Sequence, residues 1–169
     1  TALRTGDELD VLQIRPALQG AVEVSGAVYR PRVYEYRNGL RLSDALPSID
    51  DLNPDADAAY VVIRRQPEQP GHVSVRSADL RAAWSARGSA ADPLLQARDR
   101  IIVLSRDPQR SSGLEGLIGE LTQQARIDEP AAVVDVGGQV ASPGVYPLEE
   151  GMTLADLLRA GDRKSTRLN

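Results

Sequence analysis

Apolar residues near the start of the chain alternate with small or polar ones. The alternation runs over residues 21–29, around Gly26, and resumes over residues 33–37. A period of two residues is typical of β-strands with one buried face. The pattern therefore predicts a β-hairpin whose second strand ends at Asn38-Gly39. A helix should follow, and Pro47 requires it to be short or to begin again after the proline.

The same pattern occurs a second time further along the chain. Residues 24–46 (VSGAVYRPRVYEYRNGLRLSDAL) and residues 136–158 (VGGQVASPGVYPLEEGMTLADLL) align without a gap at a constant offset of 112 residues. Ten of the 23 positions are identical, which identifies an internal repeat. In the second copy, Pro143-Gly144 is typical of a tight turn, and Thr153 with Asp156 predicts a capping box. The matched residues carry no evident catalytic group, which favours a structural or binding module.

The segment between the two copies predicts the rest of a folding unit. Residues 59–65 and 72–77 have strand-like patterns, residues 77–87 have a helical pattern, and residues 97–104 return as a strand. The order of hairpin, helix, two strands, helix and strand is typical of a compact α+β unit of the β-grasp type. We therefore predict one complete unit over residues 21–105.

A second, truncated unit is predicted after a linker helix. Leu114, Leu117 and Leu121 recur at helical spacing and Ala125 extends the same face, so residues 111–127 are predicted to form an amphipathic helix. Residues 133–161 then supply only a hairpin and a helix. A segment of about 30 residues rarely folds alone. We therefore expect this half-unit to pack against the linker helix or to remain loose.

The two ends of the chain are interpreted as parts of other segments. Residues 7–12 echo residues 99–104, so residues 1–15 are predicted to be the closing strand of a preceding unit. Lys164 is the only lysine among 20 basic residues, and it lies in RKSTRLN, where the apolar pattern has stopped. We interpret residues 163–169 as a non-native tail, with a native polar terminus as the alternative. The chain is accordingly expected to be an internal fragment of a longer protein.

Composition narrows the class of protein. The 169 residues are 41% hydrophobic and 26% charged, with a net charge of −4 and no cysteine. This composition is typical of a globular domain, and it excludes disulfides and thiolate metal sites. The negative charge argues against a nucleic-acid partner, which requires a basic surface. No apolar run approaches the ~18 residues of a membrane-spanning helix, so no span is expected within the chain.

Catalytic and metal-binding patterns are weak. His72 is the only histidine and follows Pro70-Gly71, so we interpret it as a solvated loop residue rather than a general base. The run from Asp51 to Asp57 places acidic or amide side chains at alternate positions, as a calcium loop does. Ala56 and Val62 stand where such a loop requires Gly and Glu. We therefore predict no enzyme, no metal site and no cofactor.

The first hairpin offers the candidate ligand contacts. Arginines and tyrosines interleave there, and this combination suits carboxylate- and hydroxyl-rich ligands such as acidic sugars, through forked hydrogen bonds and ring stacking. The alternative is a solvated hairpin whose guanidinium groups pair with Glu35, Asp44 and neighbouring acids. The candidate contacts are Tyr29, Arg30, Arg32, Tyr36 and Arg37.

Both copies resemble the SLBB repeat, the soluble-ligand-binding β-grasp module of outer-membrane polysaccharide export proteins. The motif of that family is an apolar strand into G-x-V, then P-G-x-Y, a glycine before the helix, and L-x-D-x-[IL]. The first copy departs from P-G-x-Y at Arg32, and Arg98 occupies the family's closing glycine position. The residues that fit are Gly26, Val28, Pro31, Tyr34, Gly39, Leu42 and Asp44 in the first copy, and Gly138, Val140, Pro143, Gly144, Tyr146, Gly151, Leu154 and Asp156 in the second.

The resemblance implies a non-enzymatic module of a polysaccharide exporter for capsule or exopolysaccharide. It implies a periplasmic location, with outer-membrane association through parts of the parent protein that lie outside this chain. It also implies self-association of the full-length protein into a ring, and polysaccharide as a candidate ligand. The alternative function is a soluble small-ligand sensor that uses the same fold.

Overall fold

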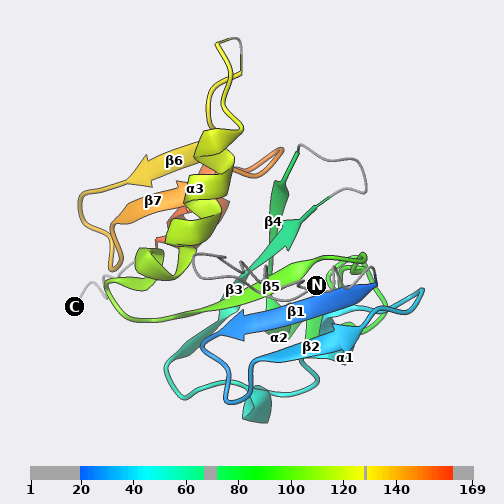
Figure 1. Ribbon diagram of the computed structural model, residues 1–169. Coiled ribbons are helices and arrows are strands. Elements are labelled where there is room, and N and C mark those ends of the chain that lie inside the picture. The colour runs from blue at the N-terminus through cyan, green and yellow to red at the C-terminus, as the bar shows by residue number, and fades with distance from the viewer. Residues whose placement is uncertain (1–19, 67–71, 128, 162–169) are drawn as a thin grey trace, which may run out of the picture.

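The computed structural model describes residues 20–66, 72–127 and 129–161, and the segments predicted for residues 1–15 and 163–169 lie outside these ranges. Two groups of elements follow each other along the chain (Figure 1). The first comprises β1 (Ala21–Gly26), β2 (Arg32–Glu35), α1 (Leu42–Ala45), the 3₁₀ helix η1 (Ile49–Asp51), β3 (Ala56–Arg65), β4 (Ser74–Ala78), α2 (Leu80–Ser85) and β5 (Arg100–Ser105). The second comprises the 3₁₀ helix η2 (Arg110–Leu114), α3 (Glu115–Gln123), β6 (Val133–Val136), β7 (Gly144–Pro147) and α4 (Leu154–Ala160).

The first group forms a mixed five-stranded sheet in the order β2-β1-β5-β3-β4. The two central strands β1 and β5 are parallel, and the remaining pairs are antiparallel. β5 lies between the β1–β2 hairpin and the β3–β4 hairpin, parallel to β1 and antiparallel to β3, which is the arrangement of the β-grasp fold. The α+β, β-grasp-like fold predicted from the sequence is therefore confirmed.

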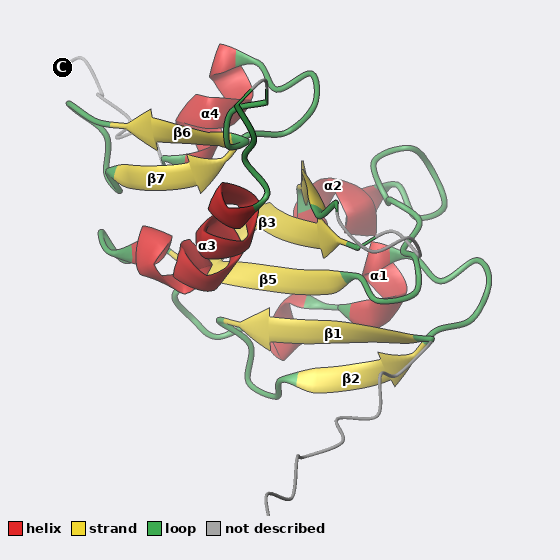
Figure 2. Cartoon of the chain, turned by 45° about the horizontal axis from the view of Figure 1, so that its top comes forward, coloured by secondary structure: helices red, strands yellow, loops and turns green. Residues whose placement is uncertain are grey.

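Each face of this sheet has its own core, and the second core covers β3, β4 and β5 but not β1 and β2. Alternate residues of β3 and β5 point to opposite faces because side chains of a strand alternate. Val61 and Ile63 join the core beneath α1 and α2, whereas Tyr60 and Val62 join a second core against α3, the β6–β7 hairpin and α4. Figure 2 shows α1 and α2 on one side of the sheet and α3 on the other.

The two repeat copies follow the same path in space. In each, the hairpin register pairs residues at the same offset: Val24 lies opposite Arg32, and Val136 lies opposite Gly144. The glycines at the matched positions 26 and 138 have φ values of +90° and +88°. The capping box predicted at Thr153 and Asp156 forms, with the Thr153 side chain accepting a hydrogen bond from the Asp156 amide. The internal repeat is thus structural as well as sequential.

The helix of the first copy ends as the sequence predicts, whereas the linker helix ends earlier than predicted. In the first copy, α1 is a single turn and a separate 3₁₀ turn follows Pro47, with Ser48 as its N-cap, as the proline requires. The linker helix ends at Gln123, earlier than the predicted residue 127, and Ala125 is exposed rather than part of the apolar face. The reason is local, because Arg126 and Glu129 exchange two backbone hydrogen bonds that close a reverse turn.

The half-unit of the second repeat packs firmly instead of remaining loose. Leu114, Leu117 and Leu121 of the linker are buried against the sheet, together with Val136 and Tyr146 of the second hairpin. The second copy therefore completes its core by covering the free face of the first unit's sheet, and in doing so it creates the groove described below.

Candidate functional site

The turn of the first hairpin lines a small cavity on the surface. The cavity has a volume of about 380 Å³, and Tyr29, Arg30 and Arg32 line it opposite Asp50 and Asp51 of η1. The Tyr29 amide donates a hydrogen bond of 3.1 Å to the Asp51 carbonyl, which fixes the hairpin turn against η1. The Tyr29 side chain remains 61% exposed. Three of the five predicted ligand contacts are therefore brought together.

The other two predicted contacts lie outside this cavity. Tyr36 is half-buried and packs against the core beneath α1 and α2, and its amide bonds to the Gly20 carbonyl. Arg37 is exposed beyond the end of β2. Its backbone carbonyl accepts a hydrogen bond from the Leu40 amide in the turn that leads to α1.

The arginines of the hairpin make no direct ion pair with other described residues, although two carboxylates line the same cavity as Arg30 and Arg32. Within the described ranges, Arg30, Arg32 and Arg37 form no ion pair. Asp44, one of the acids that could have paired with them, instead accepts a hydrogen bond from the Arg41 amide at the start of α1.

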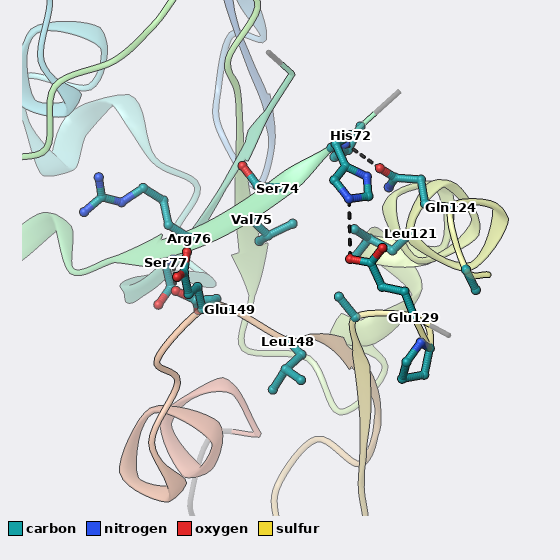
Figure 3. Close-up of a pocket in the computed structure, with 15 residues that line it drawn as sticks. His72, Ser74, Val75, Arg76, Ser77, Leu121, Gln124, Glu129, Leu148 and Glu149 are labelled. Carbon is teal, nitrogen blue, oxygen red and sulfur yellow. Dashed lines mark hydrogen bonds and ion pairs between the residues drawn. The ribbon is translucent and has the colours of Figure 1, made fainter. Parts of the chain in front are cut away.

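A larger groove, of about 630 Å³, separates β4 from the second repeat. Figure 3 shows His72, Ser74, Arg76 and Ser77 along one side, and Gln124, Glu129, Leu148 and Glu149 along the other. His72 Nε2 lies 3.5 Å from Glu129 Oε1 at one end, and the Ser77 amide donates to Glu149 Oε2 towards the other. Sequence reasoning missed this groove, because its two sides come from segments that only the docking of the second repeat brings together.

A buried charged cluster lies beneath the second repeat. Arg110 has a fully buried side chain, its Nη1 atom is 2.8 Å from Asp57 Oδ2, and its guanidinium lies 5.6 Å from the centre of the Tyr60 ring. Burial raises the pKa of the Tyr60 phenol well above its usual range, and the negative charge of Glu149 raises it further. Tyr60 therefore stays protonated and neutral. The cluster fastens η2 to β3.

The acidic side chains in the part of the chain that the structure describes do not form a metal-binding cluster. No group of three or more His, Cys, Asp or Glu residues there is placed to hold a metal ion. The acids of the run that resembled a calcium loop diverge: Asp57 pairs with Arg110, whereas Asp51 accepts a hydrogen bond from the Ser48 amide. None of the described helices is long and apolar enough to cross a bilayer.

The structure thus consists of a β-grasp unit with a docked partial copy of itself, a charged hairpin cavity and an inter-repeat groove. The family model of the SLBB domain matches residues 21–76 and 133–161, which together cover about half of the chain. The chain therefore belongs to the SLBB domain family, as the two repeat motifs predicted. SLBB domains are soluble-ligand-binding modules found in periplasmic polysaccharide export proteins. None of the curated proteins matches the chain.

Proposed function

We propose that the chain is a non-enzymatic module of an outer-membrane polysaccharide export protein, for capsule or exopolysaccharide, and that it contacts glycan through the first hairpin. The observation that carries the proposal is the group of unpaired guanidinium groups beside an exposed tyrosine. Arg30 and Arg32 supply donors for carboxylates of an acidic sugar, and the Tyr29 ring supplies a stacking face. Tyr36 and Arg37 lie on the same hairpin, beyond the opposite end of β2, and would contact only a ligand that extends past the cavity.

The proposed organisation follows the repeat. Residues 21–105 form the complete SLBB unit, residues 111–127 contain the linker helix, and residues 133–161 begin a second unit. The exposure of matched core positions supports this division: Leu42 is fully buried under the complete unit, whereas its counterpart Leu154 is 71% exposed. Residues 1–15, as a strand of a preceding unit, and residues 163–169, as a non-native tail, stay predictions.

The hairpin proposal predicts that Arg30→Ala/Arg32→Ala weakens binding to an acidic polysaccharide by at least about tenfold, because a charge-assisted hydrogen bond contributes about 1.5–3 kcal/mol. Titration calorimetry with a uronic-acid oligosaccharide at low salt measures the change. Arg81→Ala, at an exposed arginine of α2, is the matched control and should bind as the unaltered chain does. Equal binding by the double variant and the control would remove the hairpin from the glycan site.

A soluble small-ligand sensor is the second candidate function. The observation that favours it is the inter-repeat groove, whose volume of about 630 Å³ lies within the range of small-molecule sites, about 300–1,000 Å³. A combined glycan and metabolite array separates the two functions. Tight binding of one metabolite-sized compound, with no response to any glycan, favours the sensor.

The export function also implies assembly of the parent protein into a ring that forms a periplasmic passage, associated with the outer membrane. A ring requires a heterologous interface, and a stable one usually buries more than about 1,000 Å². The most exposed apolar side chains in the described residues, such as Tyr29, Ile127 and Leu154, are scattered over both repeats and the linker. We expect light scattering at micromolar concentration to report mostly monomer for this chain, and a closed oligomer for the full-length protein. A stable ring formed by this chain alone would contradict that expectation.

A further inference from the structure

The outer edge of β4 is the starting point for a second binding site. β4 is the last strand of the five-stranded sheet, so only its β3 side is paired within the sheet. On the other side, the Val73 amide donates to the Gln124 side chain and the Ser77 amide donates to the Glu149 side chain. These two side chains, one from the end of the linker helix and one from the second repeat, stand where the carbonyl groups of a sixth strand would stand.

Val75 lies midway between these two capped positions. Residues of an antiparallel pair alternate between those that exchange hydrogen bonds with the partner strand and those that do not. Because the amides of Val73 and Ser77 point away from β3, the amide and carbonyl of Val75 point the same way. Among the described residues, no hydrogen bond joins the Val75 backbone to the second repeat. An unpaired donor and acceptor therefore face the groove at the middle of the strand.

The groove along this edge has an apolar floor and an acidic rim. Val73 and Val75 pack against the core beneath the second repeat, and Leu121 and Leu148 line the groove opposite them. Among the lining residues, three carboxylates stand against one arginine and one histidine. These charged residues are Glu129, Glu149 and Glu150 on the acidic side, and Arg76 and His72 on the basic side. The rim thus favours a cationic ligand.

We propose that this groove binds a short extended peptide segment of a partner protein, with basic residues alternating with apolar ones, as an added strand along β4. Pairing of an extended segment with an exposed sheet edge is a general mode of peptide recognition, in which backbone hydrogen bonds give affinity and alternate side chains give specificity. In this groove, the Val75 backbone supplies the hydrogen bonds. The apolar side chains of the peptide meet the floor, and its basic side chains meet the glutamates. The site is separate from the hairpin surface proposed for glycan.

The experiment measures binding of the peptide acetyl-Lys-Val-Lys-Val-Lys-Val-amide to the whole chain by calorimetry and by amide NMR. We expect slowed hydrogen exchange at the Val75 amide on binding. Val75→Pro removes this amide while leaving the pairing with β3 intact, because proline is tolerated at an edge position whose N–H faces outward. It should weaken binding about fivefold to tenfold, which corresponds to one lost hydrogen bond.

Matched controls separate the contribution of backbone pairing at the β4 edge from the contribution of the glutamate charges. The matched control is Val33→Pro on β2, the opposite edge of the sheet. The Tyr36 amide donates to the Gly20 carbonyl, so by alternation the amides of residues 36 and 34 face β1 and the Val33 amide faces outward. Val33→Pro should therefore leave peptide binding unchanged. Glu150→Gln should weaken binding up to about fivefold. If Val75→Pro failed to fold, a peptide with N-methylated backbone amides, tested on the unaltered chain, should lose binding.

Three outcomes would overturn the proposal. They are equal binding of the acidic peptide acetyl-Glu-Val-Glu-Val-Glu-Val-amide, undiminished binding of the N-methylated peptide, and amide changes confined to the first hairpin. Displacement of the peptide by an oligosaccharide would assign the groove to glycan instead. Loss of glycan binding in the hairpin variants, with peptide binding retained, would keep the two sites distinct.

Discussion

Gly26→Ala is expected to lower the free energy of unfolding by more than about 3 kcal/mol, a large part of the 5–15 kcal/mol that a domain usually has. Gly26 ends β1, next to β5, with a φ of +90°, where a side chain costs about 1–2 kcal/mol. A Cβ atom added there would lie only 2.1 Å from the backbone carbonyl oxygen of Val103. The oxygen cannot yield freely, because Val103 belongs to the central parallel pair and its carbonyl accepts a hydrogen bond from the Ala27 amide.

The second copy supplies the matched control for this substitution. Gly138 has nearly the same φ, +88°, but a Cβ atom added there would meet nothing within 4 Å. Gly138→Ala should therefore cost only the conformational strain, about 1–2 kcal/mol. Urea denaturation of both variants measures the difference, which isolates the close approach between β1 and β5. Equal losses in the two variants would mean that the close approach contributes nothing to stability.

The sequence predicted the fold well where single residues determine the backbone. The glycines at positions 26 and 138 and the capping aspartates recur at one offset, and each sets a local conformation that the structure reproduces twice. Arg98 is informative in the same way: it occupies the family's closing glycine position, and its φ is +70°. The backbone keeps the left-handed turn even where the residue that favours it is absent.

The docking of the second repeat could not be predicted in detail, although one signal pointed to it. The apolar runs of β3 (YVVI) and β5 (IIVL) are continuous rather than alternating, which is typical of strands buried on both faces. That signal indicates a cover on the second face without identifying it. The groove depends on contacts such as that between Ser77 and Glu149, which are 72 residues apart, so no local pattern encodes it.

The five predicted ligand contacts on the first hairpin do not all lie together in the structure. Arg30 and Arg32 flank the turn and face the cavity beside η1, whereas Tyr36 packs against the core. Composition alone cannot distinguish these positions, because an interleaved run of arginine and tyrosine has the same chemistry along its length. Their positions along the hairpin separate them. Arg32 begins β2 at the turn, whereas Tyr36 lies beyond the other end of the strand, although both side chains are on the same face because side chains alternate along a strand.

Asp57→Ala is expected to lower the free energy of unfolding by about 3–5 kcal/mol, because it leaves the buried guanidinium of Arg110 without its counter-charge. The side chains of Arg110 and Asp57 are 0% and 8% exposed. Although Nη1 and Oδ2 are only 2.8 Å apart, none of the three guanidinium nitrogens has a hydrogen bond of good geometry. The Asp57 charge and the Tyr60 ring are thus what stabilise the cation, and loss of the charge should loosen η2 and the second repeat together.

A double-mutant cycle with Arg110→Met measures the pair itself. Removing both charges should cost less than the sum of the single losses by at least about 1.5 kcal/mol, because methionine fills the site without a charge to desolvate. Glu23 and Arg100 form the matched control, with the same separation of 2.8 Å but with side chains 44% and 43% exposed. Their coupling should be about 0.2–1 kcal/mol.

Asp57→Asn distinguishes charge from packing, since it keeps an oxygen that can accept the hydrogen bond from the Ala59 amide. If Asp57→Ala cost no more than Glu23→Ala, the buried pair would not be what fastens the second repeat to the sheet.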